Sequence, residues 1–209
     1  MKRPLRSKGV LIALEGIDGA GKSTLARAVG RRIRTKGYAV RIIREPHDPA
    51  IGKEALRVTG RDPLRAATLF TLDRLIARAG VRSLLEKRQV VLSDRSFFST
   101  LAYQGSLLSR PVRDKLEQVQ RQVTVVPDRV IWIDVPPNEA LLRVRGRGRR
   151  KSPVEREAVL ARVRSAYRRL SEQHRWLVID GRRATPELAA EVVERLLPWL
   201  DQRLGPPDR

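Results

Sequence analysis

The sequence contains no cysteine among its 209 residues, which excludes disulfide bonds and thiolate metal sites. It has two histidines, His47 and His174, and neither has a partner at metal-ligand spacing, so we expect solvated or structural roles for both. No run is apolar enough to cross a membrane, and residues 1–8 lack the apolar core of a signal peptide. We therefore expect a cytoplasmic protein with no membrane partner.

Aromatic side chains are also scarce, at 4% of residues, whereas basic side chains are abundant. The 44 Lys and Arg against 23 Asp and Glu give a net charge of +21, which indicates a polyanionic partner, either nucleotides or nucleic acid. Much of the excess is arginine scattered through predicted helices, which is typical of a solvated surface or a compositional bias. A nucleic-acid-binding surface is an alternative hypothesis, although it lacks an aromatic stripe for stacking bases.

One stretch, GIDGAGKS at residues 16–23, fits the pattern G-x-x-x-x-G-K-[ST] of a phosphate-binding loop. The apolar segment 10–14 before it predicts a buried parallel strand, and the residues after it predict a helix. Backbone N–H groups of such a loop converge on phosphate oxygens, and the helix start adds positive charge. The residues expected to bind the nucleoside triphosphate are Gly16, Ile17, Asp18, Gly19, Ala20, Gly21, Lys22, Ser23 and Thr24, with a solvated Lys22 reaching the β- and γ-phosphates and Ser23 ligating Mg²⁺.

The rest of the chain alternates predicted strands and helices. Further strands are expected at 39–43, 89–93, 129–135 and 176–180, and helices at 24–36, 49–88 with breaks near 60 and 63, 99–108, 112–123, briefly after 137, 154–173, and 185–200 with Thr185 as N-cap. This order predicts an α/β protein: a three-layer α/β/α sandwich around a five-stranded parallel sheet, in a single domain over 1–209. We expect 1–8 to be a basic lead-in and 204–209 an unfolded tail.

Several motifs, in chain order, resemble those of bacterial thymidylate kinases. They are LEGIDGAGKST at 14–24, REP at 44–46, LFTLDR at 69–74, DR at 94–95, STLAYQG at 99–105, IDVPP at 133–137 and RVRSAY at 162–167. The block from 94 to 105 is the specific part, because a phosphate loop alone indicates only a nucleoside triphosphate. The resemblance implies a P-loop NTPase fold of the nucleoside monophosphate kinase type, transfer of the γ-phosphoryl group of ATP to dTMP with Mg²⁺, and a homodimer.

The resemblance also implies which residues bind the nucleoside of the acceptor. Phe70 would stack on the thymine and Arg74 would bind its edge, while Thr100 and Gln104 would lie beside the base. Tyr103 would pack against the deoxyribose and disfavour a 2′-hydroxyl. For Phe70 the alternative is an ordinary place in the hydrophobic core.

A second set of residues is implied near the phosphates. Arg95 would hold the phosphate of the acceptor, and Asp94 would help to place Mg²⁺ or its waters, unless it only caps a strand. Asp18 would contact the 3′-hydroxyl of the sugar or the metal shell. Glu45 would border the acceptor pocket near the transferring phosphate.

The arginine-rich segment 143–153 resembles the lid of thymidylate kinases whose phosphate loop lacks an arginine. Such a density of arginine repels itself unless an anion gathers it. Because residues 19 and 20 are glycine and alanine, the charge of the transferring group must be met from outside the loop. We expect Arg147, Arg149 and Arg150 to act as arginine fingers and Arg143 to contact ATP; a solvated basic loop is the alternative.

Four positions depart from the family pattern, and three of them border the acceptor side. They are Ser96 in place of Tyr or His, His47-Asp48 in place of Gly-Gly, the segment 75–77, and the lid exit at 151–155. These departures leave ATP binding untouched and keep another acceptor open, either a different nucleoside monophosphate or a deoxynucleoside. The second possibility arises because Asp-Arg-Ser with an upstream Glu-Pro also resembles deoxynucleoside kinases.

Overall fold

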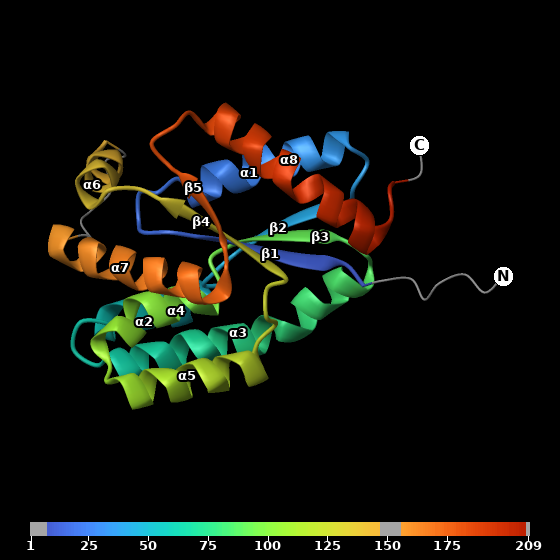
Figure 1. Cartoon of the computed structure of the whole chain (residues 1–209). Helices are drawn as coiled ribbons and strands as arrows, with labels where there is room; N and C mark the ends of the chain where they lie inside the picture. The colour runs from blue at the N-terminus through green and yellow to red at the C-terminus, as the bar shows by residue number, and fades with distance from the viewer. Residues whose placement is uncertain (1–7, 147–155, 208–209) are drawn as a thin grey trace.

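The computed structural model describes residues 8–146 and 156–207, and its core is a five-stranded sheet in the order β2-β3-β1-β4-β5 (Figure 1). Every neighbouring pair of strands is parallel. The strands are β1 Val10–Glu15, β2 Val40–Arg44, β3 Val90–Asp94, β4 Arg129–Asp134 and β5 Leu177–Asp180. The predicted five-stranded parallel sheet is therefore confirmed.

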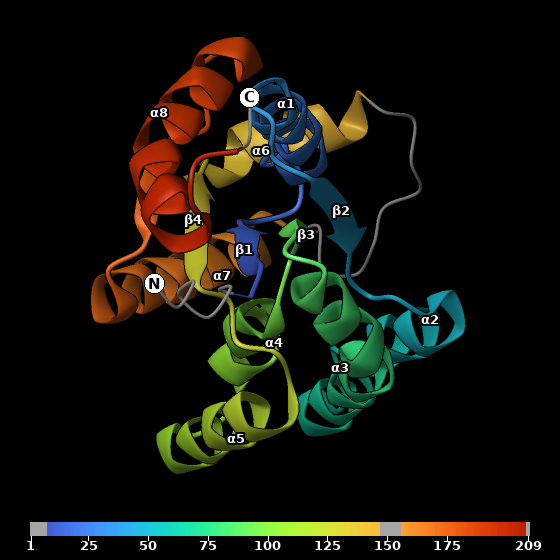
Figure 2. The same ribbon diagram turned by 90° about the vertical axis from the view of Figure 1, so that its right-hand side faces the viewer.

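Helices cover both faces of the sheet and complete the predicted three-layer sandwich. In Figures 1 and 2, α1 and α8 lie together on one side of the sheet, whereas α3, α4 and α5 lie on the other. The described helices are α1 Lys22–Thr35, α2 Pro49–Val58, α3 Pro63–Glu86, α4 Phe97–Tyr103, α5 Arg110–Val123, α6 Pro137–Arg145, α7 Glu157–His174 and α8 Thr185–Leu204, with a 3-10 turn at Gly105–Leu107. Among the described residues, no helix has both the length and the hydropathy to span a lipid bilayer.

The central strand β1 is buried on both faces, which explains its unbroken apolar sequence. Its side chains alternate between the two layers: Ile12 and Leu14 belong to the large core under α1 and α8, whereas Ala13 packs with Phe97 and Phe98 on the other side. Because β1 is fixed from both sides, the loop that follows it starts from a rigid support.

The start of α8 differs from the prediction. Its N-cap is Ala184 rather than Thr185, which is already the first helical residue, and no side chain caps this end. Pro186 in the first turn needs no N–H partner and still favours the helix start at this place.

The end of α8 also differs, because the helix continues to Leu204, past the expected end at Leu200 and into the expected tail. The hydroxyl of Tyr38 donates to Asp201 at 2.5 Å and ties this last stretch to the end of α1. Pro207 lies against Gly37, so the first residues after α8 also have a defined contact.

Candidate active site

The loop between β1 and α1 has the backbone that its glycines predict. Gly19 and Gly21 adopt φ values of +90° and +94°, and Gly21 is the N-cap of α1. A Cβ atom on Gly19 would lie 2.2 Å from the carbonyl oxygen of Ala140, so the backbone of α6 leaves no room for a side chain there. A basic residue at position 19 is therefore sterically excluded, which agrees with the expectation that positive charge comes from elsewhere.

Lys22 lies inside this loop and is not solvated as expected, since only 6% of it is exposed. Its Nζ donates to the carbonyl oxygens of Gly16 and Ile17, both at 2.9 Å. Burial lowers the pKa of Lys22 to about 8, and the nearby Arg95 charge acts in the same direction. The ammonium group thus occupies the centre of the loop and needs an anion to offset its burial.

Ser23 and Asp94 meet beside the loop. The Ser23 hydroxyl donates to Oδ2 of Asp94, the last residue of β3, and Asp94 is buried to 4% exposure. The parallel register that pairs Leu14 with Asp94 brings the end of β3 level with the end of β1. A hydroxyl and a carboxylate next to a phosphate site form an oxygen donor set that fits Mg²⁺, which takes few protein ligands and completes its shell with phosphates and waters.

A cavity of about 400 Å³ joins these groups. It is lined by Asp18, Gly19, Gly21, Lys22, Ser23, Thr24, Arg27, Arg44, Asp94, Arg95 and Val144. Two of these, Arg27 and Arg44, were missed from the sequence. Arg44 ends β2 opposite Asp94 in the sheet register, and Arg27 lies one helical turn after Ser23, so the carboxyl-edge position and the i+4 spacing were the available signals.

Arg95 connects the phosphate loop to α4. Its backbone has a φ of +83°, which is strained for a non-glycine residue. Its guanidinium pairs with Oδ1 of Asp18, donates to the Ser99 hydroxyl at 3.0 Å and lies 5.3 Å from the Tyr103 ring. Burial opposes ionisation of Asp18, but the Arg95 and Lys22 charges lower its pKa below the usual value, so Asp18 is a carboxylate.

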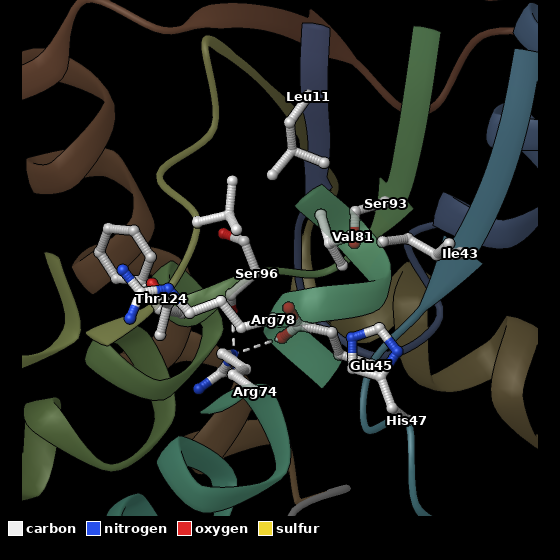
Figure 3. Close-up of a pocket in the computed structure, with 12 residues that line it drawn as sticks. Leu11, Ile43, Glu45, His47, Arg74, Arg78, Val81, Ser93, Ser96 and Thr124 are labelled. Carbon is white, nitrogen blue, oxygen red and sulfur yellow. Dashed lines mark hydrogen bonds and ion pairs between the residues drawn. The ribbon is translucent and has the colours of Figure 1, made fainter. Parts of the chain in front are cut away.

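Arg74 and Glu45 form a buried ion pair on the acceptor side, with Nε and Oε2 2.6 Å apart and 7% and 12% exposure. In Figure 3 the two side chains point toward each other, with His47 beside Glu45. Arg74 also donates to the Thr100 hydroxyl at 2.9 Å and to the carbonyl oxygens of Ser96 and Phe70 at 3.1 and 3.3 Å. Four of its five N–H groups therefore have protein partners.

The cavity in Figure 3, which Arg74 and Glu45 also line, is too small for a nucleoside. Its volume is about 20 Å³, and Leu11, Ile43 and Val81 form its apolar walls. This is room for a single water molecule. A nucleoside bound by Arg74 therefore does not occupy this cavity. Phe70, one helical turn before Arg74 on α3, is only half-buried and belongs to none of the hydrophobic clusters of the described residues.

Ser96 and Asp48 have capping roles that explain their identity: Ser96 caps α4, and Asp48 caps α2, where its carboxylate accepts from the N–H groups of Ala50 and Ile51. Ser96 is 3% exposed, and its hydroxyl accepts from the Phe98 N–H as the N-cap of α4. The backbone N–H groups of His47 and Asp48 donate to the buried carboxylate of Asp73 at 2.9 and 2.7 Å. Asp73 was missed from the sequence, where its only signal is its place directly before Arg74.

The remaining predicted residues are distributed around this centre. Tyr103 is buried, and its hydroxyl accepts from the Asp18 N–H at 3.0 Å. Gln104 is also buried and donates to the Thr59 hydroxyl at 3.2 Å. Arg143, on α6, donates to the Gly181 carbonyl at 2.9 Å, in the turn after β5. The predicted arginine fingers Arg147, Arg149 and Arg150 lie outside the described residues.

Comparison with known proteins gives matches along most of the chain. The sequence profile described as thymidylate kinase matches residues 14–192. A probable thymidylate kinase of Archaeoglobus fulgidus is 36% identical over 187 residues, which cover 88% of this chain and 92% of that protein. The thymidylate kinase of Deinococcus radiodurans is 34% identical over 199 residues, covering 89% and 95%, and a probable thymidylate kinase of Methanosarcina barkeri is 32% identical over 204 residues, covering 93% and 99%.

Proposed function

The chain belongs to the thymidylate kinase family of nucleoside monophosphate kinases, as its motifs indicated, and we propose that it transfers the γ-phosphoryl group of ATP to dTMP. One observation carries the proposal: Lys22 and Ser23 of the phosphate loop line the same cavity as Arg95, which follows β3. A donor phosphate and an acceptor phosphate would thus meet between fixed positive charges. Phosphoryl transfer needs such positioning and neutralisation more than covalent help.

On the donor side, Lys22 would exchange its two carbonyl contacts for oxygens of the β- and γ-phosphates. Ser23 and Asp94 would hold Mg²⁺, which neutralises phosphate charge when bound. Arg143 would contact ATP from α6, and Arg147, Arg149 and Arg150 would supply the arginine fingers. Changing these last three together to Ala should lower kcat by more than it raises the KM for ATP, whereas a change in KM alone would limit them to binding.

On the acceptor side, Arg95 would bind the phosphate of dTMP, and the exposed face of Phe70 would stack on the base. The fifth N–H of Arg74, which has no partner among residues 8–146 and 156–207, would reach the base edge, beside Thr100. Gln104 would lie near the base as well, and Tyr103 would pack on the deoxyribose. Glu45 would hold Arg74 in place at the pocket border and Asp18 would contact the 3′-hydroxyl.

We also propose a homodimer formed through α3. Leu64, Leu72, Leu75 and Ile76 recur at helical spacing on this helix and are 45–64% exposed. The change Leu72→Asp should shift the molar mass measured by light scattering toward one chain. Leu142→Asp, at a 65% exposed position on α6, should leave the mass unchanged; equal effects would contradict an α3 interface. The absence of cysteine supports a cytoplasmic location.

The decisive experiment is an ADP-release assay with ATP and Mg²⁺ across dTMP, dUMP, UMP, dCMP, dGMP and thymidine. A clear preference for dTMP is expected. Preference for another acceptor would contradict the proposed substrate and would direct mutagenesis to the His47-Asp48 segment. Activity on none of the six would overturn the proposed function.

A further inference from the structure

Glu15, the last residue of β1, is completely buried although it carries a carboxyl group. Oε1 accepts from the backbone N–H and the hydroxyl of Ser96 at 2.8 and 2.7 Å. Oε2 accepts from the hydroxyls of Ser99 and Tyr167 at 2.6 and 2.8 Å. Burial raises the pKa of Glu15, and the hydrogen bonds from these donors oppose that shift. A group with four donors around it and no role in the chemistry described above calls for an explanation.

The contact to Ser99 leads from Glu15 into the site. The hydroxyls of Ser99 and Tyr167 lie 2.9 Å apart, and each can give its single proton to Oε2 of Glu15, because a carboxylate only accepts. With its proton on that bond, the Ser99 oxygen has only acceptor capacity left. That oxygen then accepts a hydrogen bond from Nη1 of Arg95 at 3.0 Å. The Glu15 carboxylate thus fixes the direction of the Ser99 O–H bond. The Ser99 oxygen can then accept a hydrogen bond from the Arg95 guanidinium.

Arg95 depends on such contacts for its direction. Its backbone is in the left-handed region, where few neighbouring conformations are accessible to an arginine. Its guanidinium is held on one side by Asp18 of the phosphate loop and on the other by Ser99. Loss of the second contact would leave the guanidinium free to turn toward Asp18 and would change its place in the cavity that Arg95 lines.

We propose that Glu15 and Ser99 are positioning residues for the phosphate of the acceptor: Glu15 orients the Ser99 hydroxyl, and Ser99 fixes the Arg95 guanidinium in the cavity. The inference rests on the proposed function, in which Arg95 binds that phosphate. The competing explanation is that Glu15 only anchors the start of α4 through Ser96 and Ser99.

The test compares the dissociation constants of dTMP and thymidine, measured by calorimetry, because the two ligands differ only in the phosphate. Ser99→Ala should weaken dTMP binding by about tenfold, the effect of one lost hydrogen bond to a charged group, and leave thymidine binding unchanged. Glu15→Gln should act in the same direction, since an amide cannot accept all four hydrogen bonds.

The matched control is Ser96→Ala. It removes a bond to the same carboxylate and the N-cap of α4, but it does not touch Arg95. We expect a lower Tm and an unchanged ratio of dTMP to thymidine affinity. A purely structural role of the cluster would make Ser96→Ala and Ser99→Ala alike in both readouts, which would overturn the proposal.

A variant of Arg95 separates the positioning inference from the proposed function on which it rests. The variant must remove the charge, because lysine also binds phosphate, and Arg95→Met is therefore used. If Arg95→Met loses the preference for dTMP over thymidine and Ser99→Ala keeps it, only the positioning inference fails. If Arg95→Met also keeps the preference, the assignment of Arg95 to the acceptor phosphate fails, and the positioning inference fails with it.

Discussion

The phosphate loop at the centre of the donor half is one continuous stretch of chain, whereas the acceptor half is built from side chains distant in sequence. Residues 16–23 form the phosphate loop largely through their own backbone, with Lys22 bound to carbonyls five and six residues away. The acceptor half joins Glu45, Arg74 and Thr100 by side-chain hydrogen bonds across 29 and 26 residues.

This difference has an energetic counterpart. Lys22 is a buried cation that donates to two carbonyl oxygens and forms no ion pair with a carboxylate of the described residues, and its lowered pKa indicates that the folded state disfavours its charge. Arg74 is a buried cation with a carboxylate at 2.6 Å, and removing either partner would leave the other uncompensated. The donor half therefore contains a positive charge that a ligand can compensate, whereas the ion pair of the acceptor half stabilises the fold.

Lys22→Met gives the largest expected effect. It should lower kcat for phosphoryl transfer by about 10²- to 10³-fold, the usual cost of one preorganised electrostatic contact to a transition state. The Tm should not fall, because methionine fills the buried space without a charge. Steady-state kinetics and calorimetry on one preparation check both points. A near-normal rate, or a clearly lower Tm, would contradict the interpretation that the Lys22 charge serves the ligand and not the fold.

Arg74→Met tests the acceptor half and should reduce stability as well as activity. Leaving the Glu45 carboxylate buried without its partner should cost about 3–5 kcal/mol in the free energy of unfolding, measured with urea. The KM for dTMP should rise while that for ATP stays the same. The double variant Arg74→Met, Glu45→Leu should regain much of the stability but not the KM. If the free energy of unfolding is unchanged in the single variant, the Arg74–Glu45 pair does not stabilise the fold, and the proposed difference between the two halves is wrong.

The two halves of the site also differ in how much of each could be predicted from the sequence. The sheet, its helices and the phosphate loop follow from local patterns, since strand, glycine turn and helix are adjacent in the chain. Glu15 and Asp73 are different, because each acts through donors on other elements, brought near only by folding. The burial of Lys22 was missed because it depends on how the loop folds around the side chain, whose ammonium group donates to the Gly16 and Ile17 carbonyls.

Departures from a family motif were similarly ambiguous before the fold was known. Ser96 suggested altered acceptor specificity, yet its hydroxyl caps α4 and donates to Glu15. The helix end at Leu204 was missed as well: the expected helix ended at Leu200, although it already included Pro198, which lies inside α8 and lacks a backbone N–H to donate. Packing of Leu200 and Leu204 in the main core outweighs the lost backbone hydrogen bond.

Asp73→Asn should have an intermediate effect within the acceptor half. One of the two backbone N–H groups, from His47 or Asp48, would face an amide NH₂ instead of a carboxylate oxygen. We expect a loss of about 1.5–3 kcal/mol in the free energy of unfolding and a higher KM for dTMP. Asp48→Asn is the control, since asparagine caps a helix as well as aspartate does, and it should change neither quantity. Equal losses in both variants would mean that the 46–48 segment does not depend on Asp73.

The last prediction concerns how the free energy of unfolding depends on pH. A lysine in a stabilising ion pair makes a protein less stable as the pH rises, whereas buried Lys22 should make it more stable. The folded state holds the pKa of Lys22 near 8, below its ordinary value of about 10.4, so between these values the unfolded state binds more protons. Stability then rises with pH in this window, by at most about 1.4 kcal/mol per pH unit. Below pH 8 the wild type carries the full cost of the buried charge, and Lys22→Met should be the more stable protein. Their difference in unfolding free energy, which cancels the other titrating groups, should narrow from pH 8 to 10 in urea titrations. If the difference in unfolding free energy stays constant or widens, the protein contacts of Lys22 already compensate its charge. The donor half would then have no uncompensated charge for its ligand.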